Sequence, residues 1–196
     1  MVNYDKIYKS HNKGVCETVV EQKQERLEGL WETATLQLKE MVVGFVVRDG
    51  IVEITGSTTG DKHSVSIEKI GSVLSEFTGE NEKDIDKMGY IHTHPVSRDT
   101  MPNVMSPEDY NTHIKLCKQI DGFTTSLILT NINNQHILFG LDESGKRVDY
   151  ENVQSDVARL HGNFLSHDPS DGNPFGILAD MENIMLDNFE ACSKRF

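Results

Sequence analysis

The spacing of apolar residues changes repeatedly along the chain and predicts an alternation of helices and strands. Apolar residues recur at helical spacing between residues 17 and 36, which predicts a first helix. Residues 41–47 (MVVGFVV) and 51–57 (IVEITGS) then have the composition of two strands, and the Asp49-Gly50 pair between them is typical of a tight hairpin turn. The chain is therefore expected to open with a helix followed by a β-hairpin.

The later segments continue this alternation. The predicted elements are helices at residues 66–80, 106–120, 151–165 and 175–189, and strands at residues 88–94, 123–132 and 135–141. Because helices and strands are interspersed, we expect an α/β fold of mixed α+β type, in which one central mixed sheet is flanked by helices. Residues 1–16 read as a polar lead-in, and residues 149–196 as a helical C-terminal extension packed on the domain.

The last predicted helix carries an apolar stripe. It consists of Ile177, Met181, Ile184, Met185 and Phe189. A stripe of this kind is the face by which a helix docks onto a core, and a surface for a partner or a second copy is the alternative interpretation.

Composition and charge limit the classes of function. The chain of 196 residues has a net charge of −12, so its average surface would repel the phosphate backbone of a nucleic acid. No segment has the apolar length of a membrane span or the apolar core of a secretory signal. Cys16, Cys117 and Cys192 are far apart, so we expect neither a disulfide framework nor a thiolate zinc site. These features predict a soluble protein of a reducing, cytoplasmic compartment, without nucleic-acid or membrane partners.

The candidate chemistry lies in residues 89–110, GYIHTHPVSRDTMPNVMSPEDY. Alternate side chains of a strand point to the same face, so His92 and His94 are expected on one side, about 7 Å apart along the chain. Pro95 cannot continue a ladder, which places both histidines at the carboxyl end of the strand. This separation suits two imidazoles that converge on one metal ion.

The helix expected after this loop begins with a strong start signal. Ser106 at the N-cap, Pro107 at the first helical position, and Glu108 and Asp109 in the first turn are explained by helix capping alone. The Asp109 carboxylate has a second option, which is to turn toward a cation. Two neutral imidazoles and one carboxylate, with a fourth position left for water, are the ligand set of a catalytic zinc site.

This combination resembles the JAMM (MPN+) family of zinc metalloproteases, also called the JAB1/MPN domain. The family pattern is an upstream Glu, then His-x-His-Pro, then Ser-x-x-Asp, and the matching residues are Glu40, His92, His94 with Pro95, and Ser106 with Asp109. The resemblance covers roughly residues 17–145 and implies an MPN-like metalloprotease domain at residues 17–148. It implies one zinc ion per chain, held by His92, His94 and Asp109, with Glu40 and Ser106 as the catalytic residues.

The sequence departs from the family pattern in two places. Eleven residues separate His94 from Ser106, more than the family usually has, so the loop at residues 95–105 is expected to form a rim or lid of the cleft, or else an inert insertion. Glu40 precedes Gly44 by four positions instead of three, and Glu53 in the second strand is its rival as the acid. We favour Glu40, because it lies at the helix-to-strand junction where the family places this residue.

The resemblance implies a zinc-dependent metallopeptidase or isopeptidase. A zinc-activated water would hydrolyse an amide or isopeptide bond, with Glu40 as the general base and the Ser106 hydroxyl as a donor to the oxyanion unless it only caps the helix. The substrate would be a protein or peptide, such as the tail of a ubiquitin-like or sulfur-carrier protein. The alternative is a non-catalytic MPN-like scaffold that binds a partner. A metal-hydrolase barrel is disfavoured, because it needs more chain than follows His94.

The other residues able to do chemistry are weaker candidates. Cys117 is expected to be a small, packed apolar residue of its helix. A lone histidine lacks the partners that a metal needs, so surface or core positions are expected for His11, His63, His113, His136, His161 and His167.

Overall fold

Up to residue 188, helices and strands follow one another along the chain in the predicted order. The computed structural model describes residues 14–61, 64–75, 84–95, 105–132, 134–143, 147–166 and 174–196. Within these residues the helices are α2 (Val15–Gln37), α3 (Ile67–Leu74), α4 (Pro107–Gln119), α5 (Tyr150–Leu165) and α6 (Pro174–Asn188). The strands are β1 (Met41–Arg48), β2 (Ile51–Thr59), β3 (Lys87–Thr93), β4 (Phe123–Ile132), β5 (Gln135–Glu143) and β6 (Phe189–Arg195). The predicted mixed α/β class is confirmed.

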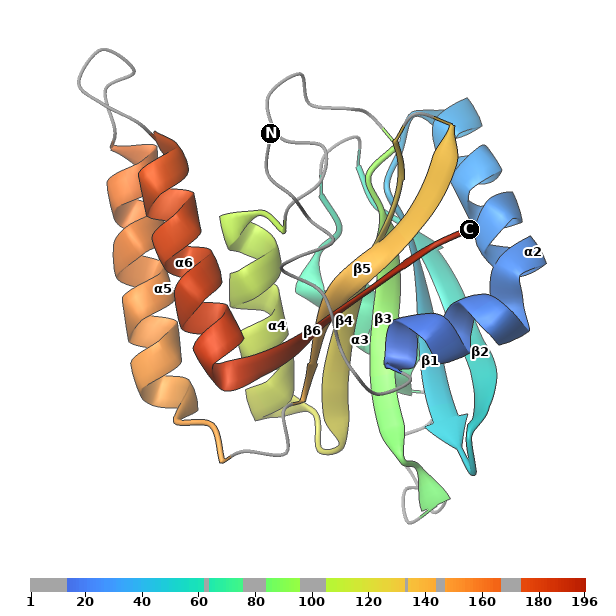
Figure 1. Cartoon of the computed structure of the whole chain (residues 1–196), viewed down its shortest axis with the longest axis horizontal. Helices are drawn as coiled ribbons and strands as arrows, with labels where there is room; N and C mark the ends of the chain where they lie inside the picture. Colours follow the sequence, from blue (N-terminus) through green and yellow to red (C-terminus); the bar gives the residue numbers. More distant parts are fainter. Residues whose placement is uncertain are drawn as a thin grey trace.

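The strands of the described residues form one sheet of six, in the order β2-β1-β3-β4-β5-β6 (Figure 1). Neighbouring strands are antiparallel except β3 and β4, which are parallel. Parallel strands need a crossover connection, and α4 provides it. β3 therefore lies in the middle of the sheet, and the chain leaves its carboxyl end to reach the start of α4.

The predicted hairpin between β1 and β2 is confirmed. Arg48 pairs with Ile51, and the two residues between them, Asp49 and Gly50, have φ angles of 49° and 74°. Positive φ at both central residues is the geometry that an Asp-Gly turn adopts at little cost. Gln22 of α2 stabilises this turn by two hydrogen bonds. Its side chain donates to the Gly50 carbonyl at 2.7 Å and accepts from the N–H of Val52 at 2.9 Å.

The sheet is covered on both faces, and the helices divide the core into three clusters (Figure 1). α2 packs on one face, against apolar residues such as Phe45 and Ile91. α3 and α4 pack on the other face, against residues such as Val42 and Tyr90. α5 and α6 pack beside α4 in the third cluster. The stripe of the last helix is the expected docking face, because Met181, Met185 and Phe189 are buried there.

The structure differs from the predicted elements in the length of one helix and in one additional strand. The helix expected at residues 66–80 is shorter: α3 has Ser66 as its N-cap and ends at Leu74, and residues 76–83 lie outside the described part of the chain. β6 was not predicted at all. It pairs with β5 from Phe189, opposite Glu143, to Arg195, opposite Ile137, so the chain returns to the sheet after α6.

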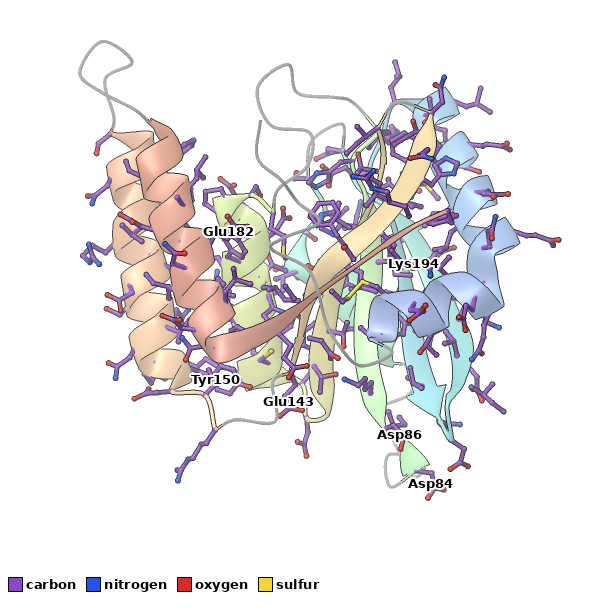
Figure 2. All side chains as sticks on the ribbon, in the orientation of Figure 1. Asp84, Asp86, Glu143, Tyr150, Glu182 and Lys194 are labelled. Atoms are coloured by element: carbon purple, nitrogen blue, oxygen red, sulfur yellow. A yellow bond between two sulfur atoms is a disulfide. The ribbon has the colours of Figure 1, made fainter. Side chains whose placement is uncertain are left out.

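The expectation of unpaired cysteines was wrong for two of the three. Cys16 of α2 and Cys192 of β6 form a disulfide with their Cα atoms 5.8 Å apart, while Cys117 is free. α2 passes beside β6, and Figure 2 shows Lys194 of β6 next to this helix, where its Nζ donates to Glu17 at 3.0 Å. The expected reducing compartment rested on unpaired cysteines and loses that support. Among the described helices, none combines the length and apolarity required to cross a bilayer.

Candidate metal centre

β3 brings the two histidines to its carboxyl end. His92 lies in the strand, opposite Val42 of β1 and Ile128 of β4, and is buried. His94 follows the strand, where its N–H donates to the Leu129 carbonyl at 3.1 Å. The hydrogen bonding to β4 thus continues past the last strand residue. As a result, His94 stays on the same side of the sheet as His92, with the two ring centroids 4.8 Å apart.

The start of α4 holds the carboxylate. The Asp109 N–H donates to Ser106 Oγ at 3.2 Å, and the Ser106 N–H donates to Asp109 Oδ2 at 2.7 Å. This reciprocal pair is a capping box, with Pro107 at the first helical turn, and it confirms the predicted helix start. Because the cap fixes the Asp109 side chain, its other oxygen is directed away from the helix in a defined position.

The three side chains converge on one point. His92 Nε2 lies 3.0 Å from His94 Nε2 and 3.2 Å from Asp109 Oδ1, and His94 Nε2 lies 3.8 Å from Asp109 Oδ2. One ligand atom from each residue lies within 4.8 Å of the others, which makes this a group that could hold a metal ion. The donors fit zinc, since two imidazole nitrogens and one carboxylate oxygen are a ligand set of catalytic zinc sites.

The charged forms of His92 and Asp109 stabilise each other. Burial lowers the pKa of His92, but the Asp109 carboxylate, the Glu40 carboxylate and the Leu127 carbonyl outweigh it and raise the pKa of this imidazole. Burial raises the pKa of Asp109, yet the two histidines and the backbone of Ser106 hold it well below its usual value. Asp109 is thus an anion at neutral pH, as a ligand of a divalent cation must be.

Glu40 lies at the junction between α2 and β1. Its side chain is buried, and its charge acts on His92. The backbone of Glu40 is fixed on both sides, because its N–H donates to the Asp61 carbonyl at 2.9 Å and its carbonyl accepts from the Gly60 N–H at 2.8 Å. The next residue, Met41, donates its N–H to Thr93 Oγ1 at 2.9 Å, which joins this junction to the end of β3. Glu40 is therefore held next to the histidines.

Glu53 has a different environment. It lies opposite Val46, four positions along β1 from Val42, which is opposite His92. Its half-exposed carboxylate is 3.8 Å from Arg48. Glu53 therefore lies several residues along the sheet from the histidines and is paired with a basic side chain.

The remaining sequence candidates are distributed over the molecule. His113 is buried in the core, the His136 ring lies beside the rings of Trp31 and Phe196, and His161 lies 3.1 Å from Glu108. His11, His63 and His167 lie outside the described residues, as do residues 96–104 of the loop interpreted as a rim or lid. The core position of His113 is among those expected, but its hydrogen bond to Ser126 Oγ, at 2.8 Å, had no signal in the sequence.

A comparison of the chain with protein-family models finds no match, and a comparison with curated proteins finds none either. The resemblance to the JAMM family therefore rests on the motif residues alone.

Proposed function

We propose that the protein is a zinc-dependent metallopeptidase or isopeptidase of the JAMM type, with one zinc ion per chain held by His92, His94 and Asp109. One observation carries the proposal: two imidazole nitrogens and a carboxylate converge within 4.8 Å, and the charge of the buried Glu40 acts on the same imidazole. A scaffold that only binds a partner has no physical need for a convergent ligand set with a buried acid beside it.

Each residue would have a separate role. Zinc, when bound, supplies Lewis acidity that lowers the pKa of a water toward about 7 and polarises a carbonyl. Glu40 would accept the proton of the attacking water and deliver it to the leaving amine, so that one proton passes from water to product nitrogen.

Ser106 has two candidate roles. Its Oγ accepts a hydrogen bond from the Asp109 N–H, which caps α4. The same hydroxyl keeps its own proton, which it could donate to the oxyanion of a tetrahedral intermediate. The two roles are compatible, since one uses a lone pair and the other uses the hydrogen.

The proposed substrate is a protein or peptide with a scissile amide or isopeptide bond, such as the tail of a ubiquitin-like or sulfur-carrier protein. The net charge of −12 favours such partners over nucleic acids. The cytoplasmic location expected from the sequence stays part of the proposal, and the redox state of Cys16 and Cys192 in protein isolated under alkylating conditions tests it.

The test uses a ubiquitin-like protein fused through its tail to a fluorescent reporter, with Glu40→Gln and Glu53→Gln as a matched pair. Both substitutions remove one carboxylate and keep the shape of the side chain. We expect Glu40→Gln to keep its zinc and to lose activity by a factor of about 100 to 10,000, the usual contribution of a general base. Glu53→Gln should behave like the wild type. Activity that survives in Glu40→Gln and disappears in Glu53→Gln would reverse the assignment.

The outcome for the wild type itself decides between enzyme and scaffold. Cleavage that stops with a chelator and returns with zinc supports the peptidase. A zinc-loaded protein that binds the fusion without cutting it would support the scaffold instead.

A further inference from the structure

Three buried polar residues next to the metal centre have no part in the proposed reaction. Tyr90 lies two residues before His92 on β3, Ser126 lies on β4, and His113 lies on α4. All three are almost fully inaccessible to solvent, at 1%, 0% and 0% exposure. Buried polar groups are costly unless they are hydrogen-bonded, so their partners indicate what they do.

The three residues form a hydrogen-bonded chain. The Tyr90 hydroxyl is bonded to the Ser126 side chain, and Ser126 Oγ lies 2.8 Å from His113 Nδ1. On the other side of the ring, His113 Nε2 lies 3.7 Å from Cys117 Sγ. The Cys117 side chain is in turn hydrogen-bonded to the Tyr150 side chain. Tyr150 is labelled in Figure 2 at the start of α5, beside Glu143. The hydrogen-bonded chain thus begins at Tyr90, beside the candidate ligand His92, and runs along α4 to Cys117, near the end of this helix.

The members of this chain are uncharged at neutral pH. Burial lowers the pKa of His113 to about 3, so its ring is neutral, with one nitrogen that donates and one that accepts. Burial also raises the pKa of Tyr90 and raises that of Cys117 to about 12. A neutral chain of this kind cannot act by its charge on the site, and it holds its members in fixed orientations instead.

The Tyr90 ring lies between the metal centre and the core. Its centroid is 5.6 Å from the His92 ring, at an interplanar angle of 31°, and 6.0 Å from the Phe123 ring, at 21°. The His92 ring also meets His94 and Asp109. The His92 imidazole is therefore contacted by the metal-ligand group and by the Tyr90 ring, and the Leu127 backbone is a third partner.

We propose that Tyr90 is a positioning residue for His92, and that its hydroxyl, anchored through Ser126 to His113, fixes the ring against which the His92 imidazole rests. The inference rests on the proposed metal centre, because it assigns Tyr90 to the orientation of one of its ligands. Residues that orient metal ligands typically change metal affinity by about 10- to 100-fold when they are altered.

The test compares Tyr90→Phe with Thr125→Val. Tyr90→Phe keeps the aromatic ring and removes the hydroxyl anchor. Thr125→Val removes an equally buried hydroxyl of β4, which donates to Asp142 at 2.7 Å instead of to the chain that ends at His113. We expect Tyr90→Phe to weaken zinc binding about tenfold and Thr125→Val to leave it unchanged, even if both lower the melting temperature.

A double-variant cycle tests whether the chain acts as a unit. Ser126→Ala should weaken zinc binding as Tyr90→Phe does, and the double variant should be no weaker than either single variant, because both remove the same anchor. Independent, additive losses in zinc affinity would show that Tyr90 and Ser126 do not act through one hydrogen-bonded chain.

The ring resonances of His92 in the metal-free protein separate this inference from the metal proposal. NMR of histidine-labelled protein should show the His92 ring resonances shifted or broadened in Tyr90→Phe and unchanged in Thr125→Val, whether or not the wild type binds zinc. If the wild type binds no zinc but this shift is seen, the proposed function fails and the positioning role stands. If Tyr90→Phe matches the wild type in both ring resonances and zinc affinity, or if Thr125→Val changes them equally, Tyr90 is a packing residue only and the inference is wrong.

Discussion

The Nε2 atoms of His92 and His94 face each other at 3.0 Å, with Asp109 Oδ1 3.2 Å from the first of them. Two imidazole nitrogens at this distance cannot both present lone pairs to each other, so either a hydrogen carried by one of them or a metal ion lies between them. In the metal-free protein, the Asp109 and Glu40 carboxylates raise the pKa of His92 and so favour a protonated imidazole. Zinc would replace that proton, since it binds the neutral form of histidine.

The dual role of Ser106 can be divided by two substitutions at one position. Ser106→Ala removes both the cap and the hydroxyl, whereas Ser106→Asn keeps an N-cap acceptor of similar quality and removes the hydroxyl. We expect Ser106→Ala to lose about 1 kcal/mol of unfolding free energy and Ser106→Asn to lose less. If the hydroxyl serves the oxyanion, both variants should lose kcat, as measured on the reporter fusion.

If Ser106 only caps α4, the loss of kcat would follow the loss of stability. Ser106→Asn would then be close to the wild type in both kcat and unfolding free energy.

His113 should make the protein less stable in mild acid. Its pKa falls from 6.5 in the unfolded chain to about 3 in the folded protein, so the unfolded state binds an additional proton between these values. The stability gained by keeping His113 neutral is full above pH 6.5 and is lost as the pH falls toward 3. Near pH 5.5 the expected loss is about 1.4 kcal/mol, the value of one pKa unit.

The comparison with His113→Gln isolates this contribution. Urea unfolding of both proteins without metal, at pH 7.5 and 5.5, cancels the titration of the groups that they share. The stability difference between wild type and variant should shrink by about 1.4 kcal/mol at the lower pH. A difference that is the same at both pH values would show that His113 is not buried in its neutral form.

The disulfide should contribute substantially to stability. Cys16 and Cys192 are 176 positions apart, so their bond restricts almost the whole unfolded chain. Reduction of the wild type is expected to lower the unfolding free energy by about 2 to 4 kcal/mol. The same reductant should have no effect on Cys16→Ser, which serves as the control. A wild-type protein whose unfolding is insensitive to reductant would contradict the pairing.

The parts of the fold that the sequence predicted are those with local signals. The Asp49-Gly50 turn has a dipeptide signature, and the Ser106–Asp109 capping box is contained in four residues. The alternation of side chains in a strand likewise placed His92 and His94 on one side. Each of these features is fixed by residues that are neighbours along the chain.

The parts that were missed depend on contacts between distant segments. β6 contains charged residues at Glu190 and Lys194 and lacks a regular apolar alternation, so only its pairing with β5 makes it a strand. Nothing local joins Cys16 to Cys192. His113 looked like a lone histidine because its partner, Ser126, lies on the next strand.

Metal content of the purified protein tests the central claim most directly. The site variant is His92→Ala/His94→Ala, and the matched control is His136→Ala/His161→Ala, which also removes two histidines but leaves the convergent group intact. The account predicts one zinc per chain in the wild type and in the control, and none in the site variant. Stoichiometric zinc in the site variant, or a wild type that binds no zinc when it is supplied, would contradict it.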